Sequence, residues 1–404
     1  LFGDFHVHTT FSFDAFMLSL PAASGEGAHP PADACDFARF CSALDFWSVN
    51  DHAEYVTENH WDQTVESIRQ CNAVADPKNP DTVAFLGWEW TNVGTTPENH
   101  YGHKNVVLAH TEEGKIPPRP VAAANVFRLF AQQQFNPFGL GFAAFAGRDQ
   151  RYHDMARFFA DRANLKECAP DDGPEDYPDD CIVTAEDPGE LFSQLDAWDV
   201  DAIVIPHGTA WGMYTPAGSN WDKQLTPEMH DPKYQTLFEI YSGHGNSEQY
   251  RPWRAVDFDA NGKATCPPVR DNYLPTCQRA GQIVEARCRA EGEAAAECGK
   301  RAAVARSNAA EAGLQAHLTV PGAAPEDWLD AGQCQDCSMP AFNLRPGSSA
   351  QYVMAIRNFN KTDGGDPLRF RFGFMGSSDN HFARAGTGYK EVHRRGFTES
   401  RDWG

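Results

Sequence analysis

The chain has 404 residues, of which 41% are hydrophobic and 12% aromatic, and it carries a formal net charge of −22. It is long enough to bury a large core, in one elaborated domain or in more than one. The negative charge excludes nucleic acid and anionic membranes as general partners, because their phosphates would be repelled. The apolar stretches are short and interrupted, so the sequence predicts no membrane span.

Residues 1–110 alternate short apolar runs with helical stretches. We predict strands over 2–8, 45–52, 82–90 and 103–108, and helices over 31–44 and 61–75. This alternation indicates a parallel sheet or an α/β barrel. Functional sites in such folds lie at the carboxyl ends of the strands.

Two polar segments interrupt this pattern. Residues 111–188 are rich in proline and glycine, and we interpret them as an insertion. A helix then leads into a strand that ends at His207 and a further strand over 236–245. Residues 251–345 form a second insertion, which is Cys-rich and partly helical, around one long helix near 276–312. A helix over 348–360 and a last strand over 370–381 follow. We predict one domain, 1–404, with its core in residues 1–110, 189–250 and 346–395.

The chain contains 11 cysteines. Eight of them lie in the two insertions: Cys168, Cys181, Cys266, Cys277, Cys288, Cys298, Cys334 and Cys337. Disulfides suit such polar segments and are typical of an oxidising compartment. The alternative is a structural zinc site at Cys334 and Cys337, but the upstream spacings of about ten residues do not match zinc knuckles. The odd total leaves at least one free thiol, which we place among Cys35, Cys41 and Cys71.

The cysteines also bear on where the protein functions. Disulfides form in exported proteins, and the chain begins at Leu1, as a processed export product would. We therefore predict a periplasmic or extracellular location. The sequence leaves the oligomeric state open.

His6 and His8 are separated by one residue on the first predicted strand, so both imidazoles face the same side. Asp379 and His381 repeat this spacing on the last strand. Paired imidazoles fill a core poorly but bind a metal ion well.

Further imidazoles and carboxylates lie at the ends of the other predicted strands. They are Asp14, Asp51, His52, Glu89, His103 and His207. Without Asp51, the whole set contains six histidines and three carboxylates, which exceeds the four ligands of one tetrahedral ion. We predict two or three divalent ions of zinc, manganese or iron. The predicted metal ligands are His6, His8, Asp14, His52, Glu89, His103, His207, Asp379 and His381, with Glu89 or Asp379 as a bridge.

Each of these residues alone has a simpler explanation. Asp14 would cap a turn, and Glu89, between two tryptophans, could be exposed on its strand. His52 or His207 could be a hydrogen-bonded packing histidine. On a regular strand the side chain of Asp51 points away from that of its neighbour His52. We therefore predict that Asp51 orients a ligand instead of binding the metal itself. The recurrence of the whole set at strand ends favours a metal site.

The set resembles the PHP (polymerase and histidinol phosphatase) superfamily of metal-dependent phosphoesterases, and more closely its DUF3604 branch. The resemblance rests on His6-Val7-His8, Asp51-His52, Glu89 in G-W-E-W, His103 in G-H-K-N-V, His207 in I-P-H-G and Asp379-Asn380-His381. It implies an α/β fold, a distorted (β/α)7 barrel with two large insertions, and a trinuclear site.

We therefore expect hydrolysis of a small-molecule phosphate ester by a hydroxide that bridges two of the ions. The predicted catalytic residues are Glu89, Asp379, Asp51 and, as general acid, His244 after a core strand. Arg357 is a candidate for a phosphate oxygen, although a helical arginine is more often a surface charge.

Two other functions stay open. Amidohydrolase barrels also begin with H-x-H, although their last strand normally gives a lone aspartate without the second histidine. An exported metal-containing protein without catalytic activity is the other alternative, because a fold does not determine a function.

Overall fold

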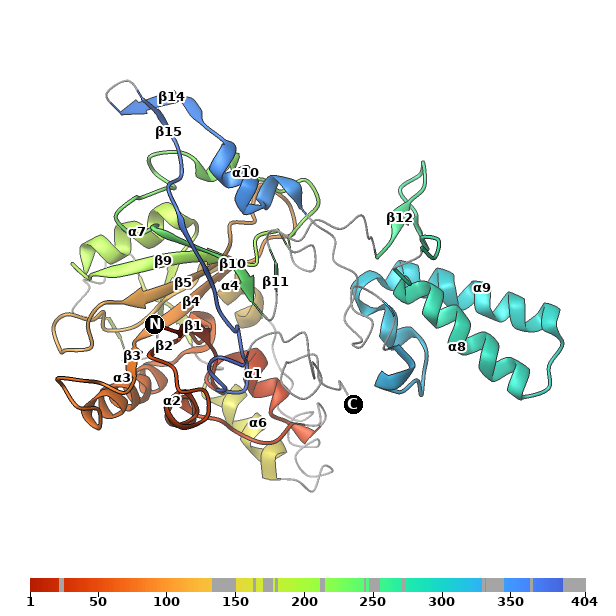
Figure 1. The fold of residues 1–404 in the computed structure, drawn as a ribbon, viewed down its shortest axis with the longest axis horizontal. Coiled ribbons are helices and arrows are strands. Elements are labelled where there is room, and N and C mark those ends of the chain that lie inside the picture. The colour runs from red at the N-terminus through yellow and green to blue at the C-terminus, as the bar shows by residue number, and fades with distance from the viewer. Residues whose placement is uncertain are drawn as a thin grey trace. The chain divides into compact units, whose positions relative to one another are not determined.

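The computed structural model describes residues 1–21, 25–132, 150–162, 165–169, 177–178, 181–210, 215–242, 245–246, 255–270, 273–328, 331, 345–363 and 366–387. The chain divides into two compact units (Figure 1). The first comprises Leu1–Ala210, Thr215–Glu248 and Arg345–Tyr389. The second comprises Trp211–Tyr214, Gln249–Leu344 and Lys390–Gly404.

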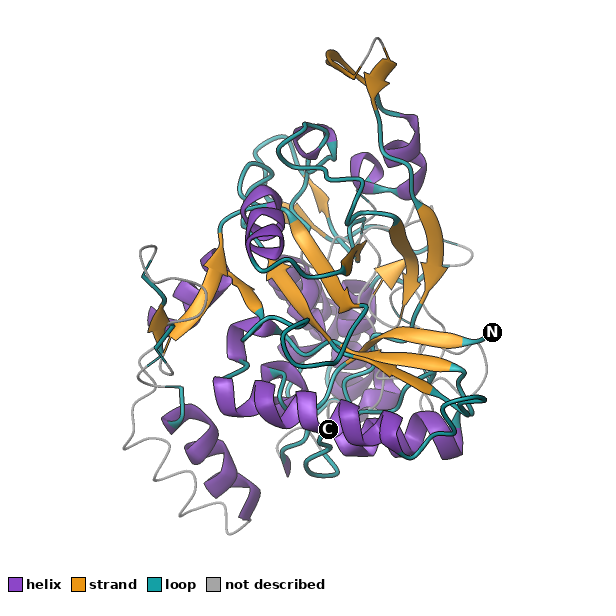
Figure 2. Ribbon diagram, turned by 90° about the vertical axis from the view of Figure 1, so that its left-hand side faces the viewer, coloured by secondary structure: helices purple, strands orange, loops and turns teal. Residues whose placement is uncertain are grey.

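The first unit begins with a parallel sheet. Its strands are β1 (Gly3–Val7), β2 (Phe46–Val49) and β3 (Val83–Phe85), in the order β1-β2-β3. The connecting helices are α2 (Pro31–Asp36, prolonged by the π-helical turn Phe37–Cys41) and α3 (Glu58–Ala73). Both helices lie along one side of the sheet (Figures 1 and 2). The Asn72 side chain fixes α3 to the sheet, because it exchanges two hydrogen bonds of 2.8 Å with the backbone of Ala84.

A second sheet carries three of the predicted ligands. It consists of β4 (Gly87–Asn92), β5 (Gly102–Leu108) and β9 (Ala202–His207). Both pairings are antiparallel, so the parallel pairing that we expected is wrong for these strands. The nine-residue connection from β4 to β5 is too short for the crossover, of about a dozen residues or more, that parallel strands need. His103 is in register with both Thr91 and His207, which places the three side chains on one face.

Single bridges link the first sheet to two other segments of the unit. Val7 at the end of β1 bridges Asn380, and His52 after β2 bridges Glu89 in β4. Further strands are β10 (Leu237–Ser242), β11 (Gly245–Asn246) and β16 (Gly373–Gly376), in the order β11-β10-β16. The described strands thus form small sheets in a mixed α/β unit, and a closed seven-stranded barrel stays a prediction.

The remaining elements of the first unit surround these sheets. They are α1 (Phe13–Leu18), β6 (Val121–Ala123), α4 (Ala124–Gln132), α6 (Gln150–Ala160), β7 (Lys166–Glu167), β8 (Cys181–Ala185), α7 (Pro188–Ala197), α10 (Ala350–Ala355), β14 (Asn358–Asp363) and β15 (Asp366–Leu368). The predicted helix over 348–360 ends at Ala355, and its last residues form β14 instead. Val121 of β6 and Ile182 of β8 share one buried core with Trp47 and Trp88.

The second unit contains two helices where we predicted one. They are α8 (Thr276–Ala290) and α9 (Ala295–Ala312), which lie side by side (Figure 1). The break occurs at Gly292, whose φ of 82° favours glycine and ends the first helix. The short strands β12 (Asp257–Phe258) and β13 (Ala264–Thr265) form a hairpin in the same unit. Alanine and cysteine side chains pack between the two helices, as at Ala280, Cys277 and Ala309.

Four disulfides confirm the expected use of the cysteines. They join Cys35 to Cys71, Cys168 to Cys181, Cys266 to Cys277 and Cys288 to Cys298. Among the described residues Cys41 is the free cysteine, and it is exposed. Cys334 and Cys337 lie outside the described residues. Four disulfides indicate an oxidising environment. None of the described helices is long and apolar enough to cross a membrane.

The disulfide between Cys288 and Cys298 closes the turn between α8 and α9. We expect Cys288→Ser with Cys298→Ser to lower the free energy of unfolding of the second unit by about 2 to 4 kcal/mol, because the open turn gains conformational freedom in the unfolded state. Urea unfolding with limited proteolysis of the α8–α9 segment measures this loss. Cys41→Ser is the matched control, and an equal change in both variants would contradict the expectation.

His60 is a half-buried neutral imidazole near the start of α3. Its Nδ1 lies 3.1 Å from the Thr57 hydroxyl and accepts a hydrogen bond of 3.1 Å from Arg162. Burial, aided by the Arg162 charge, lowers the pKa of His60 to about 4. The unfolded imidazole titrates near pH 6.5, so the unfolded chain binds more protons between pH 6.5 and 4. The neutral His60 imidazole therefore contributes fully to the free energy of unfolding above pH 6.5, and this contribution is lost as the pH falls towards 4.

We expect His60→Gln to remove this acid sensitivity, which amounts to about 3 kcal/mol. Urea unfolding at pH 7 and at pH 4.5, in the presence of a chelator, measures the difference for each variant. The partly exposed His110 provides a control as His110→Gln. The explanation fails if His60→Gln loses as much stability on acidification as the unaltered chain.

Candidate metal centre

The predicted ligands come together from seven separate segments of the first unit. They are His6 in β1 and His8 just after it, Asp14 in α1, His52 after β2, Glu89 in β4, His103 in β5, His207 in β9, and Asp379 and His381 after β16. His6, His8, Glu89 and His207 are almost fully buried, each with at most 1% exposure. Glu89 is therefore not the exposed strand residue that its place between two tryptophans allowed.

Four ligand atoms form the tightest part of the cluster. The Nε2 atoms of His6 and His8 lie 3.2 Å apart. Glu89 Oε2 lies 3.3 Å from the first and 3.1 Å from the second. Asp379 Oδ1 lies 3.2 Å from His6 Nε2 and 3.3 Å from His8 Nε2. Five of the six separations within this group are thus nearly equal, and we call it the four-atom group.

Hydrogen bonds at the opposite ring nitrogens determine the tautomers of the two histidines. His6 Nδ1 lies 2.9 Å from Glu239 Oε2 and donates to it, because a carboxylate only accepts. His8 Nδ1 lies 2.9 Å from Ser12 Oγ. The Ser12 hydroxyl donates a hydrogen bond of 3.1 Å to Asp51 Oδ1, so it accepts the one from His8. In its neutral form each ring therefore carries its proton on Nδ1, and its Nε2 presents a lone pair.

The four-atom group is consequently a set of four electron-pair donors without a proton to share when the rings are neutral. A tetrahedral ion with bonds of about 2.0 to 2.1 Å to nitrogen and oxygen has ligand separations of about 3.3 Å. Five of the separations among the four atoms, at 3.1–3.3 Å, match this spacing. The residues present thus suit a divalent cation such as zinc.

The second oxygen of Glu89 faces a different pair of imidazoles. Oε1 contacts His103 Nδ1 closely and lies 3.4 Å from His207 Nε2. It also accepts a hydrogen bond of 3.1 Å from Thr91 Oγ1. Glu89, His103 and His207 form a second group that could hold a metal ion. Because its two oxygens belong to two groups, Glu89 has the geometry of a bridging carboxylate.

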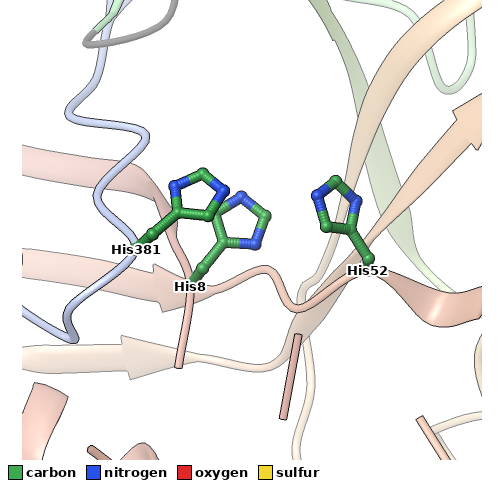
Figure 3. A group of neighbouring side chains, drawn as sticks. All are labelled: His8, His52 and His381. Carbon is green, nitrogen blue, oxygen red and sulfur yellow. The ribbon is translucent and has the colours of Figure 1, made fainter. Parts of the chain in front are cut away.

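His8, His52 and His381 form a third group, shown in Figure 3. The rings of His8 and His381 stack at 4.2 Å between their centroids. Asp14 Oδ2 lies 3.1 Å from His52 Nε2 and 2.9 Å from His381 Nε2. The Asp14 side chain is 43% exposed, so the cluster reaches solvent on this side.

In the third group, the Nδ1 atoms of His52 and His381 also have hydrogen-bond partners. His52 Nδ1 lies 2.6 Å from Thr91 Oγ1, which donates its own proton to Glu89. His381 Nδ1 lies 3.1 Å from the backbone oxygen of Asp379. Asp379 itself has a φ of 52°, a left-handed conformation that aspartate tolerates better than most residues. The same pattern of Nδ1 donors and Nε2 lone pairs thus extends through four histidines.

The carboxylates and imidazoles strongly perturb one another. Burial lowers the pKa of His6, but Asp379 and Glu239 outweigh it and raise that pKa well above its usual value. In His52 burial is likewise outweighed, by Glu89 and Asp14, which raise the pKa to about 9. Burial raises the pKa of Glu89, yet the surrounding imidazoles hold it well below its usual range. Without a metal ion, protons on the imidazoles would balance the carboxylates, so metal ions and protons compete for the cluster.

Three predicted residues lie apart from the ligand atoms or cannot be placed. Asp51 accepts hydrogen bonds from the Thr9 amide at 2.6 Å and the Thr9 hydroxyl at 2.7 Å, besides the one from Ser12. Its oxygens thus accept hydrogen bonds from Thr9 and Ser12, and it orients His8 through Ser12. Arg357 donates to the backbone oxygens of Met354 and Ile356 at the end of α10. His244 lies outside the described residues.

Sequence reasoning missed Glu239, a buried carboxylate in the middle of β10. The signal was present, since an acidic residue inside an apolar strand needs a polar partner in the core. Ser12 and Thr91 were also missed, because a hydroxyl that orients a histidine has no spacing that distinguishes it from other hydroxyls.

Comparisons with known proteins leave the family open. No protein-family model matches the chain, and neither the curated proteins nor the solved structures provide a match. The functional argument therefore depends on the residues of the cluster themselves.

Proposed function

We propose that this chain is a metal-dependent hydrolase of PHP type that cleaves small-molecule phosphate esters. The observation that carries the proposal is the four-atom group, in which two Nε2 atoms lie 3.2 Å apart and each lies 3.1–3.3 Å from the same two carboxylate oxygens. Glu89 extends it to a second group and His8 to a third. We propose two or three ions of zinc, manganese or iron at these groups.

Divalent ions in such a centre activate water at neutral pH and compensate the charge of phosphoryl oxygens. The role of Glu89 is to join two groups through its two oxygens. Asp51, through Ser12, keeps the His8 ring turned so that Nε2 faces inward. Asp14 is the most exposed ligand, and the substrate would approach the cluster from its side.

Charge balance also supports cations in the cluster. Within the described parts of the chain, the ion pairs of Glu89, Glu239 and Asp14 are all made with histidines. Buried carboxylates need compensating positive charge, which metal ions would provide in place of protons on the imidazoles. The disulfides complete the proposal with a periplasmic or extracellular location.

A screen with two panels tests the activity. Protein loaded with zinc, manganese or iron is assayed with p-nitrophenyl phosphate and phosphodiesters, and in parallel with small amides and lactones. We expect turnover of the phosphate esters, lost on chelation and retained in His110→Ala. Turnover of only the amide and lactone panel would replace the phosphoesterase with an amidohydrolase. Full metal occupancy without turnover of either panel would indicate a protein without catalytic activity.

A further inference from the structure

Glu239 is a buried carboxylate outside the predicted ligand set. It lies within β10, with 1% exposure, and its Oε2 accepts two hydrogen bonds. One comes from His6 Nδ1 at 2.9 Å and the other from Ser377 Oγ at 2.8 Å. These donors come from opposite ends of the first unit's chain, since β1 begins the sequence and Ser377 follows β16.

Both donors belong to, or lie next to, residues of the four-atom group. His6 is one of its four ligands, and Ser377 precedes Asp379, another ligand, by two residues. The Ser377 amide also donates to the Tyr241 carbonyl in β10, so the segment before Asp379 is attached to the strand that carries Glu239. The Asp379 amide in turn donates to the His6 carbonyl at 2.9 Å. One carboxylate thus holds two ligand-bearing segments in register.

Glu239 could itself be considered a ligand, because it lies with His6 and His207 in a group close enough to hold an ion. Its contacts favour a different role. Glu239 Oε2 already accepts two hydrogen bonds. The nitrogen that it contacts is His6 Nδ1, whereas Glu89 and Asp379 lie at His6 Nε2. A carboxylate behind a metal-binding histidine fixes the ring and strengthens it as a ligand.

We propose that Glu239 is a positioning residue that holds His6 as the Nδ1–H tautomer and orders the segment bearing Asp379. The metal centre's role in this inference rests on the proposed function, but the tautomer of His6 does not. When the acceptor at position 239 is removed, the neutral ring of His6 is free to carry its proton on either nitrogen.

The test compares Glu239→Ala, Glu239→Gln and Ser377→Ala. Nitrogen-15 NMR of the metal-free protein, at alkaline pH where the imidazoles are neutral, reports which nitrogen of His6 carries the proton. We expect the Nδ1–H form in the unaltered chain and in Ser377→Ala, and a mixture in Glu239→Ala. Glu239→Gln retains an acceptor oxygen and is expected to restore most of the Nδ1–H form. An unchanged His6 tautomer in Glu239→Ala would overturn the proposal.

Metal binding provides the second readout. Zinc affinity, measured by competition with a chromophoric chelator, is expected to fall about 10- to 100-fold for one ion in Glu239→Ala, with smaller loss in Glu239→Gln. Loss of a whole ion in Glu239→Gln would identify Glu239 as a ligand and overturn the positioning role. If the unaltered chain binds no metal but shows the expected tautomers, the proposed function fails while the role of Glu239 on His6 stands.

Discussion

Replacing His6 and His8 together by alanine is expected to remove at least one bound metal ion per chain. The two rings provide two atoms of the four-atom group, and His8 also belongs to the third group. Phosphate-ester hydrolysis should fall by on the order of 10³ or more, because Lewis-acid stabilisation of the transition state is worth several kcal/mol. Metal content by mass spectrometry and initial rates with p-nitrophenyl phosphate measure the two effects.

Two controls distinguish the loss of metal ligands from the loss of the folded structure. His110→Ala removes a partly exposed imidazole that pairs with Glu112 and Asp201, away from the cluster. Thermal unfolding of both variants in chelator shows whether the double variant is folded. A folded double variant that retains both metal content and activity would refute the assignment of the first strand to the metal centre.

Metal removal is expected to destabilise the first unit. The cluster contains buried carboxylates and inward-facing lone pairs, so the proposed ions would bind the folded state far more tightly than the unfolded chain. An ion present at about 1,000 times its dissociation constant contributes about 4 kcal/mol to stability. Chelation should therefore lower the urea midpoint of the first unit and leave that of the disulfide-linked α8–α9 segment unchanged.

The chelation effect should also depend on pH. The pKa of His52 is raised to about 9, and that of His6 lies well above its usual value, so protons partly replace the ions in the chelated protein. Groups with raised pKa values contribute stability that is complete below the unfolded value of about 6.5 and is lost as the pH rises. We therefore expect the chelated protein to be less stable at pH 9 than at pH 6. Equal midpoints with and without chelator at both pH values would contradict a buried cation site.

Much of the candidate site could be predicted because its ligands follow the periodicity of strands. An H-x-H pair must place both rings on one face, and His6 and His8 do so. Carboxyl ends of neighbouring strands gather at one place, which brings His52 and Glu89 together through a single bridge. These inferences need only local geometry and strand order.

The parts that could not be predicted depend on contacts between distant segments. Asp14 lies in the first turn of a helix rather than in a loop, and His52 and His381 turn it towards the cluster. Glu239 and Ser12 act through hydrogen bonds to single ring nitrogens, which leave no repeating pattern in the sequence. The antiparallel pairing of β4, β5 and β9 likewise depends on tertiary packing rather than on the apolar runs themselves.

The central claim is that the clustered histidines and carboxylates hold metal ions. Its most direct test is elemental analysis of the protein purified without added metal, by mass spectrometry, together with equilibrium binding of zinc and manganese to the chelated protein. We predict two or three divalent ions per chain, with loss of at least one in His6→Ala with His8→Ala. A purified chain that contains no transition metal and binds none after chelation would contradict the account.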